Sequence, residues 1–277
     1  MRHAFTVDLE DWYHGIPIAG EAKRVAERRL HVGTDRLLEM LHRNNAKATF
    51  FALSLIADEH PALLRRIAEA GHDIGSHGQS HDLLYEMGPE RFREETRSSK
   101  RTLEDCIGKP VHSYRAAYFS ITRRSLWALE ILAAEGIRFD SSIFPVKNWR
   151  YGIADYSRRP LVVETAAGPI LEFPLSTRRV LGRNVPSTGG AYFRLYPYFL
   201  TRSNLHAAER EGLPVVFYLH PWELDPDHPF VRFRPKAMAT HYARLRSTAP
   251  KLERLLSEFR FTTLGEVLTD AFPRLGS

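Results

Sequence analysis

The stretch Ala4-Phe-Thr-Val-Asp-Leu-Glu-Asp11 sets a pattern that recurs along the chain, because a short β-forming run ends there in acidic side chains. Similar runs follow at intervals, and longer segments of helical periodicity separate them. Strands that alternate with helices are typical of βα units around a parallel sheet. The runs predict seven or eight strands, over residues 4–7, 48–53, 73–76, 113–115, 138–140, 170–173, 215–219 and 260–262.

The segments between these runs predict helices. Thr34 is placed to cap the first of them, and prolines stand near the start of three others. A chain of 277 residues is long enough for one α/β barrel, which takes roughly 250 residues. We therefore predict a single domain over residues 1–277, with a decorating loop at 141–169 and a C-terminal closing segment at 221–277. The predicted helices cover residues 34–44, 61–70, 89–107, 122–135, 197–211 and 249–259.

The composition is that of a globular enzyme, with 43% hydrophobic and 26% charged residues. No run approaches the roughly 20 apolar residues that a membrane helix needs. The strand-like pattern begins at once at the N-terminus and leaves no room for a secretory signal, so we expect the chain to be cytoplasmic. The single cysteine, Cys106, is interpreted as a packing residue. The net charge of +6 comes from scattered arginines, which fits an anionic substrate or membrane surface better than nucleic acid.

Polar side chains follow several predicted strands at the point where each strand ends. The carboxyl ends of parallel barrel strands open on one face, and the active sites of such barrels are assembled there. The alignment of these side chains therefore predicts an active site at that face. They are Asp8, Glu10, His77, Arg115, Asp140 and His220.

Two of the histidines have a spacing that suits a metal site. His77 and His81 are four residues apart, so on one helical turn they would project on the same side and could both bind one ion. A carboxylate from the acidic cluster of Asp8, Glu10 and Asp11 would complete a site of two histidines and one acid. A helix cap or an acidic turn is the alternative interpretation of that cluster.

Hydrolysis at a metal needs one carboxylate that binds the ion and a second one that takes a proton from the attacking water. Arg115 could hold the second carboxylate through a charge-assisted hydrogen bond, and a surface ion pair is the alternative. His220 could protonate a leaving amine, and a buried structural histidine is the alternative. The position of both residues at strand ends favours the catalytic interpretation.

These residues resemble the motifs of the polysaccharide deacetylase family, also called the NodB-homology or carbohydrate esterase family 4 group. The sequence is most similar to the branch found beside exosortase-type exopolysaccharide loci, and the resemblance covers nearly the whole chain. The segments that carry it are Thr6-Val-Asp8, Ala48-Thr-Phe-Phe-Ala-Leu53, Ser76-His77 through His81, Arg115-Ala-Ala-Tyr118, Tyr218-Leu-His220 and Phe259-Arg-Phe-Thr-Thr-Leu-Gly-Glu-Val-Leu268.

The resemblance implies a distorted (β/α)7-type barrel and a carbohydrate N-deacetylase, which removes N-acetyl groups from amino sugars by cleaving a linear amide C–N bond. The implied cofactor is a divalent metal, Zn first, with Co, Mn or Fe(II) as alternatives. The backbone N–H near Tyr118 would help to hold the oxyanion. The other roles that the motifs imply are general base for Asp8, metal ligand for His77 and His81, orientation of the base for Arg115, and general acid for His220.

The first motif departs from the family pattern, because Leu9 occupies the place of the usual metal-binding aspartate. We assign the third ligand to Glu10, because two residues along a strand return a side chain to the same face. Asp11 is the reserve candidate. The candidate substrate contacts, for which core packing is the alternative, are Trp222, Tyr192 and Arg194.

The expected partner is an N-acetylated glycan, or a lipid-linked or nucleotide-linked sugar of the kind that a cytoplasmic enzyme would meet. A peripheral contact with a membrane polysaccharide-assembly system is a further expectation, and no nucleic-acid partner is expected. Two alternatives stay open, namely a hydrolase of small ureides or cyclic amides on the same fold and a catalytically inactive glycan-binding module. The sequence leaves the oligomeric state and the identity of the sugar open.

Overall fold

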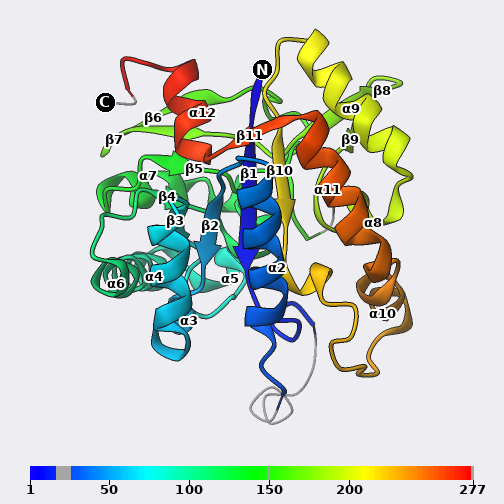
Figure 1. Cartoon of the computed structure of the whole chain (residues 1–277). Coiled ribbons are helices and arrows are strands. Elements are labelled where there is room, and N and C mark those ends of the chain that lie inside the picture. Colours follow the sequence, from blue (N-terminus) through cyan, green and yellow to red (C-terminus); the bar gives the residue numbers. More distant parts are fainter. Residues whose placement is uncertain (17–25, 149, 276–277) are drawn as a thin grey trace.

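A computed structural model describes residues 1–16, 26–148 and 150–275 of the chain. In these residues one sheet of nine strands forms the centre of the molecule, and its strands run in the order β10-β1-β2-β3-β4-β5-β7-β6, with β11 paired to the start of β1 (Figure 1). All neighbouring pairs are parallel except β6 with β7. The strands are β1 (Arg2–Leu9), β2 (Thr49–Ala52), β3 (Asp73–Ser76), β4 (Ser113–Tyr114), β5 (Phe139–Asp140), β6 (Leu161–Thr165), β7 (Gly168–Glu172), β10 (Val216–Leu219) and β11 (Arg260–Thr262).

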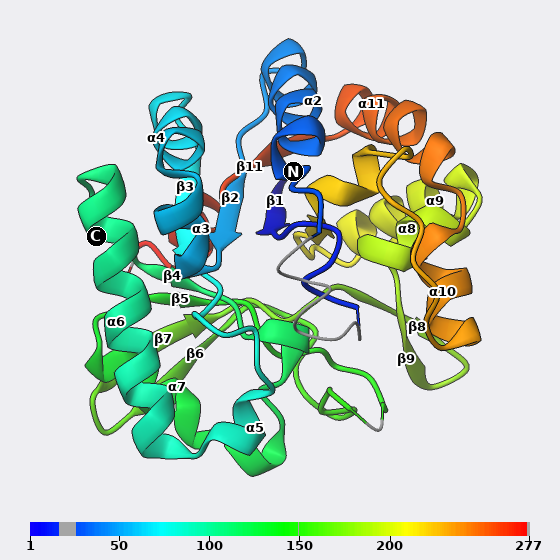
Figure 2. The same cartoon turned by 90° about the horizontal axis from the view of Figure 1, so that it is seen from below.

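Helices surround the sheet on its outer side. Figure 2 looks onto the carboxyl ends of the strands and shows the helices as a ring that encloses them. A separate two-stranded hairpin, β8 (Thr177–Val180) with β9 (Arg183–Pro186), lies to one side of the sheet. The helices are α2 (Leu30–Arg43), α3 (Ser54–Glu59), α4 (Pro61–Glu69), α5 (Leu84–Met87), α6 (Pro89–Ile107), α7 (Trp127–Ala134), α8 (Gly190–Leu195), α9 (Tyr198–Arg210), α10 (Pro235–Tyr242), α11 (Thr248–Glu258) and α12 (Leu264–Ala271).

Strand pairing does not close the barrel between the edge strands β6 and β10 in the described part of the chain. The segment after β7 bridges this gap with side chains instead of a strand. The Val216 N–H donates to the Ser176 hydroxyl at 2.8 Å, and the Thr188 hydroxyl donates to the Val216 carbonyl at 2.8 Å. The α/β fold with a parallel sheet is confirmed, and this irregular edge makes the barrel a distorted one.

The alternation of side chains along β1 separates the core from the site. Phe5, Val7 and Leu9 are fully buried in the largest hydrophobic cluster, which also holds leucines of α2, α4 and α11. Because successive strand residues point to opposite faces, Thr6 and Asp8 point to the inner side of the sheet. The outer face of β1 thus anchors the helices, and its inner face is free to carry polar groups.

Two predictions about elements are wrong. Residues 141–169 are not simply a loop, because β6 in this range forms an antiparallel pair with β7. Thr34 does not cap the first helix, because α2 already begins at Leu30 and the Thr34 hydroxyl donates to the Leu30 carbonyl within the helix. The carboxylate of Asp11 accepts from the N–H groups of Arg29 and Leu30, so a residue distant in sequence supplies the cap.

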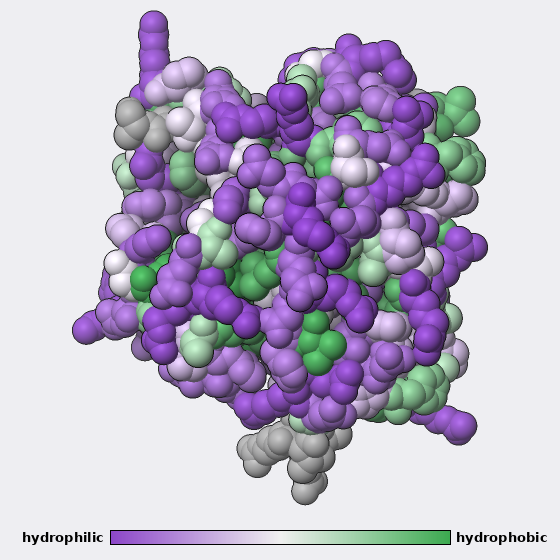
Figure 3. All heavy atoms as spheres, in the orientation of Figure 1, coloured by the Kyte–Doolittle hydropathy of each residue, from purple (hydrophilic) through white to green (hydrophobic). Residues whose placement is uncertain are grey.

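The outer surface is mainly hydrophilic, with small, separate hydrophobic areas in the view of Figure 3. Among the described helices, not one combines the length and the apolar character that crossing a bilayer requires. Cys106 is half-buried against the main core cluster, as expected for a packing residue.

Candidate active site

Three side chains with metal-binding atoms meet at the carboxyl end of the sheet. Glu10 directly follows β1, His77 directly follows β3, and His81 lies in the loop after β3. Nε2 of His77 is 3.0 Å from Oε1 of Glu10, and Nε2 of His81 is 2.9 Å from the same oxygen. One ligand atom from each lies within 4.8 Å of the other two, and the residues that the structure describes contain no second group of this kind. This trio, the donor set, is the ligand set predicted with Glu10.

The hydrogen bonds around His77 fit a cation at the donor set. Its Nδ1 is 2.7 Å from the carbonyl oxygen of Arg115, which can only accept, so Nδ1 carries the proton. Its Nε2 lies 3.0 Å from Oε1 of Glu10, where a divalent cation could take the place of the proton that otherwise joins the two atoms. Imidazole nitrogen and carboxylate oxygen are ligands that Zn²⁺ and related divalent ions bind.

Glu10 itself is ionised in this environment. It is only 3% exposed, and burial alone would raise its pKa. Positive charge at His81 and hydrogen bonds from His77 and His81 nevertheless hold the pKa of Glu10 well below its usual range. A carboxylate that binds a metal must be deprotonated, so Glu10 is ready to bind one at neutral pH.

A loop rather than a helical turn brings the two histidines together, which corrects the predicted geometry. Gly78 and His81 both have left-handed backbone conformations, with φ of 80° and 55°. Glu95 on α6 fixes this loop, because its Oε1 accepts from the N–H groups of Gln79 and Ser80 at 3.0 and 3.2 Å. The histidine pair therefore converges on Glu10 through two unusual backbone angles that a spacing of four residues does not reveal.

Asp8 lies beside the donor set but is held by an arginine. The Arg115 Nη1 donates to Asp8 Oδ1 at 2.8 Å and to the Thr6 hydroxyl at 2.8 Å. The other guanidinium nitrogens are satisfied by Ser141, whose carbonyl and hydroxyl oxygens each lie at 2.9 Å. Arg115 is fully buried, with its guanidinium 4.4 Å from the ring centre of Phe51. The arrangement leaves Asp8 outside the donor set and fixes the orientation of its carboxylate.

His220 directly follows β10, and its side chain lies near Asp8. Its Nε2 lies 3.8 Å from Asp8 Oδ2, and its Nδ1 lies 2.9 Å from Oε1 of Glu223. Burial alone would lower the pKa of His220, but the hydrogen bond and charge of Glu223, together with the charges of Glu10 and Asp8, raise it to about 9. His220 is therefore a protonated group at neutral pH, as a general acid must be before it acts.

Arg194 is wrongly predicted as a substrate contact. The turn at Gly189 and Gly190 and helix α8 direct it inward, where it is only 2% exposed. Its Nε donates to Oε2 of Glu223 at 2.5 Å, and its Nη1 donates to the carbonyls of His241 and Ala243. Arg194 thus orients the carboxylate that in turn holds His220.

Asp11 is wrong as a reserve ligand for the metal. Its two carboxylate oxygens accept from the N–H groups of Trp12, Arg29 and Leu30, at distances of 2.8 to 3.1 Å. This bonding pattern is the capping alternative that the acidic cluster left open. Asp11 connects the strand that carries Glu10 to the start of α2.

The remaining predicted residues lie around the site in different ways. The ring of Tyr118 is 4.4 Å from that of His81, and the Tyr118 backbone is left-handed with φ of 55°. Trp222 is half-buried and stacks on His220, with 5.5 Å between ring centres. Tyr192 is half-buried and places its hydroxyl 3.4 Å from that of Tyr151. Trp222 therefore flanks the candidate acid directly, whereas Tyr192 lies farther along the surface.

Sequence reasoning missed three residues that shape the site. Glu223 stands three residues after His220, a spacing at which a side chain can reach back to a turn, and this signal could have revealed it. Ser141 had no such signal, because its contact with Arg115 depends on the pairing of β4 with β5. The guanidinium of Arg150 lies 3.8 Å from the ring centre of Tyr118, and this contact likewise depends on the fold.

Comparison with known proteins gives two adjoining family matches. Residues 29–137 match the model described as polysaccharide deacetylase, and residues 141–269 match a domain of unknown function, DUF3473. The chain is 34% identical over 98 residues to a peptidoglycan-N-acetylglucosamine deacetylase of Bacillus cereus, which covers 35% of this chain and 36% of the relative. It is 31% identical over 100 residues to a chitooligosaccharide deacetylase of Azorhizobium caulinodans, which covers 36% and 45%.

Solved structures extend the likeness over the whole fold. A peptidoglycan N-acetylglucosamine deacetylase shares 18% identity with a TM-score of 0.53, over 97% of this chain and 88% of that one. An allantoinase shares 16% identity with a TM-score of 0.60, over 94% and 85%. The curated relatives are matched over less than half of their own length, whereas these folds align almost throughout. Residues 29–137, which include both histidines of the donor set and Arg115, are thus similar to polysaccharide deacetylases, and the fold of the chain is similar to that of a solved deacetylase.

Proposed function

We propose that the protein is a metal-dependent hydrolase that removes N-acetyl groups from the amino sugars of a glycan or a glycan precursor. The observation that carries this proposal is the placement of Asp8 and His220 3.8 Å apart and close to Glu10 of the donor set, each held by its own charged partner. The two curated relatives above are named as deacetylases of N-acetylglucosamine in peptidoglycan and of chitooligosaccharides, which supports this substrate class.

The donor set suits zinc best, because two imidazole nitrogens and one carboxylate oxygen are the ligands of a catalytic zinc with open positions. Co, Mn and Fe(II) are the alternatives to be compared with it. A divalent ion bound there would polarise the acetamide carbonyl and lower the pKa of water. We assign the remaining steps to side chains of this chain.

Asp8 would take the proton from the attacking water, since its Oδ2 is the carboxylate oxygen that Arg115 leaves free. His220 would then donate a proton from Nε2 to the leaving sugar nitrogen, while Glu223 keeps Nδ1 protonated. The loop from Ala116 to Tyr118 would present a backbone N–H to the oxyanion, and the Ala116 N–H bond to the Ser142 hydroxyl at 2.8 Å fixes the start of that loop.

The test is acetate release from N-acetylglucosamine oligomers by purified protein loaded in turn with Zn, Co, Mn and Fe(II). Asp8→Asn keeps the shape of the side chain but removes the base, and we expect it to abolish release without loss of bound metal. Release that persists in Asp8→Asn would contradict the assigned base. Metal binding without release from any oligomer would contradict the proposed reaction.

The two alternatives are distinguished in the same experiment. Hydrolysis of allantoin but not of N-acetyl sugars would identify a small-ureide or cyclic-amide hydrolase, whose fold the allantoinase shares. Glycan binding without bound metal would identify an inactive binding module. The cytoplasmic location, the role in exopolysaccharide biosynthesis, the exosortase-type branch and the contact with a membrane assembly system stay predictions, which cell fractionation and gene context would test.

A further inference from the structure

A large groove lies within the part of the chain that matches the domain of unknown function. Its volume is about 1080 Å³. The segment after β5, the β8–β9 hairpin, Tyr192 and the end of α9 line it. Its lining includes two carboxylates, those of Asp155 and Glu211, and five cationic side chains. The cations are Lys147, Arg158, Arg159, Arg179 and Arg183. We call this hollow the basic groove.

Both carboxylates of the basic groove are already paired. Glu211 binds Arg158 with 2.7 Å between Oε2 and Nη1, and Asp155 binds Arg123. Lys147, Arg179 and Arg183 are exposed, and no described carboxylate lies within 4.0 Å of their charged nitrogens. Three cations around one hollow repel each other unless an anion lies between them. The basic groove therefore has unpaired positive charge directed at a space large enough for a ligand.

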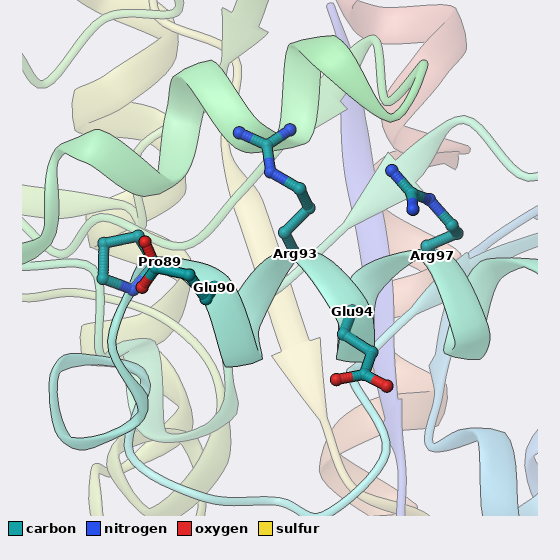
Figure 4. A pocket seen from close by; sticks show the side chains of 5 residues that line it. All are labelled: Pro89, Glu90, Arg93, Glu94 and Arg97. Carbon is teal, nitrogen blue, oxygen red and sulfur yellow. The ribbon is translucent and has the colours of Figure 1, made fainter.

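A second hollow, which residues of α6 line, differs from the basic groove in its balance of charge. Its volume is about 410 Å³, and Figure 4 shows Arg93 and Arg97 on one side of the helix and Glu94 on the other. Glu135 pairs with both arginines, with Arg97 Nη2 at 2.8 Å and Arg93 Nη1 at 3.7 Å from its Oε1. Glu90 and Glu94 also line this hollow, so its carboxylates outnumber its arginines. This second hollow holds no unpaired charge that would select an anion.

The basic groove reaches the donor set through a short chain of aromatic contacts. Tyr151 lines the basic groove, and its ring centre is 6.4 Å from that of Phe119. The neighbouring Arg150 covers the ring of Tyr118, which is 4.4 Å from the ring of His81. These residues mark the path along which a substrate would have to extend from the donor set to the basic groove.

We propose that the basic groove binds an anionic group of the substrate, either a uronate carboxylate or a pyrophosphate, that is attached near the N-acetylated sugar. This inference rests on the proposed function. Guanidinium groups bind carboxylate and phosphate with two parallel hydrogen bonds, and Arg179 and Arg183 supply two such groups. The substrate class is thus an acidic glycan or a pyrophosphate-linked sugar precursor, and the second half of the chain is the part that recognises it.

The test uses four probes of stated charge. Inorganic pyrophosphate, UDP-N-acetylglucosamine and a tetrasaccharide of alternating glucuronate and N-acetylglucosamine carry anions, and chitotetraose is neutral. Binding is measured by calorimetry with the metal-loaded protein, its Lys147→Gln/Arg179→Gln/Arg183→Gln variant and a matched control. The control is Arg43→Gln/Arg101→Gln/Arg246→Gln, which removes three charges at exposed, ion-paired positions outside the basic groove.

We expect the groove variant to bind at least one anionic probe about tenfold more weakly than wild type, because up to three charged contacts of a few-fold each are lost. The control variant should bind like wild type. The affected probe identifies the anion, since loss for the glucuronate tetrasaccharide indicates an acidic glycan and loss for the two pyrophosphate probes indicates a precursor. Equal losses in both variants, or anionic probes that bind no more tightly than chitotetraose, would overturn the inference.

Acetate release separates this inference from the proposed function. Release from chitotetraose with no preference for the anionic probes would leave the function standing and refute the role of the basic groove. Binding of an anionic probe through the basic groove with no acetate release from any N-acetyl sugar would refute the proposed function and leave the role of the basic groove standing. In a deacetylating protein, the ratio of kcat/KM for the charged over the neutral substrate should fall about tenfold in the groove variant.

Discussion

Replacing Glu223 by Gln should shift the pH range in which the protein can act as an acid catalyst. Glu223 is fully buried and accepts from both the backbone N–H and Nδ1 of His220, at 3.0 and 2.9 Å. Burial alone would lower the pKa of His220, but the hydrogen bond and charge of Glu223 are the leading causes that raise it from 6.5 to about 9. That rise is about 2.5 units, equivalent to about 3 kcal/mol.

The sign of the effect follows from the role of His220. A general acid must hold its proton, so activity should persist below the pKa of His220 and fall as the pH rises through it. Wild-type kcat should therefore decline near pH 9. In Glu223→Gln the amide keeps the shape but not the charge, and the decline should move about 2 units lower. A metal at the donor set is common to both proteins, so its influence on His220 cancels in this difference.

The assay is kcat for acetate release between about pH 6 and pH 10, with Asp227→Asn as the control. Asp227 is an exposed carboxylate that pairs with Arg246, away from His220. Its replacement should leave the alkaline limb of the profile in place. A Glu223→Gln protein that loses activity equally at every pH, with an unmoved alkaline limb, would refute the reasoning and reduce Glu223 to a structural role.

Three further predictions concern metal, packing and charge. His81→Ala should lower bound zinc, measured by metal analysis after dialysis, because only two ligands of the donor set remain; unchanged stoichiometry would contradict the site. Gly33→Ala should destabilise the fold by about 1–3 kcal/mol in denaturant titration, because an added Cβ would overlap the backbone of Pro221, whereas Gly265→Ala, which meets a movable ring at 3.2 Å, should be close to neutral. Burial raises the pKa of Glu172 well above 4.5, so above about pH 5 the unfolded chain loses a proton that the folded chain keeps. The free energy of unfolding should therefore fall with rising pH, by up to about 1.4 kcal/mol per pH unit. Glu172→Gln should remove this pH dependence, and an unchanged dependence would count against a protonated Glu172.

The sequence predicts the parts of the site that depend on single strands. Alternation along β1 correctly separates Glu10 from Leu9, because that alternation is a local property of any strand. The ends of β3 and β10 likewise place His77 and His220. Each of these positions follows from the rule that parallel strands open their carboxyl ends on one face.

Tertiary contacts decide the parts that the sequence does not predict. The sequence predicts Arg194 as a substrate contact, but the buried carboxylate of Glu223 binds its guanidinium group. Asp11 caps α2, so its role can be predicted only where the start of α2 is known, and the bond to Asp11 itself helps to fix that start. A long polar side chain reaches several partners within a few ångströms of its backbone, so its role depends on what the fold brings near it.

The two family matches adjoin near residue 140, and the two parts of the chain that they cover contribute different groups to the site. The N-terminal part supplies Glu10 and the histidines, which form the donor set, and Arg115, which holds Asp8. The part from residue 141 onward supplies His220 with its charged support and the basic groove. Arg115 is itself completed by Ser141, so neither part can form the site alone. Under the proposed function, a change in the second part should alter which glycan is accepted while the donor set stays in place, and the groove variant tests this separation.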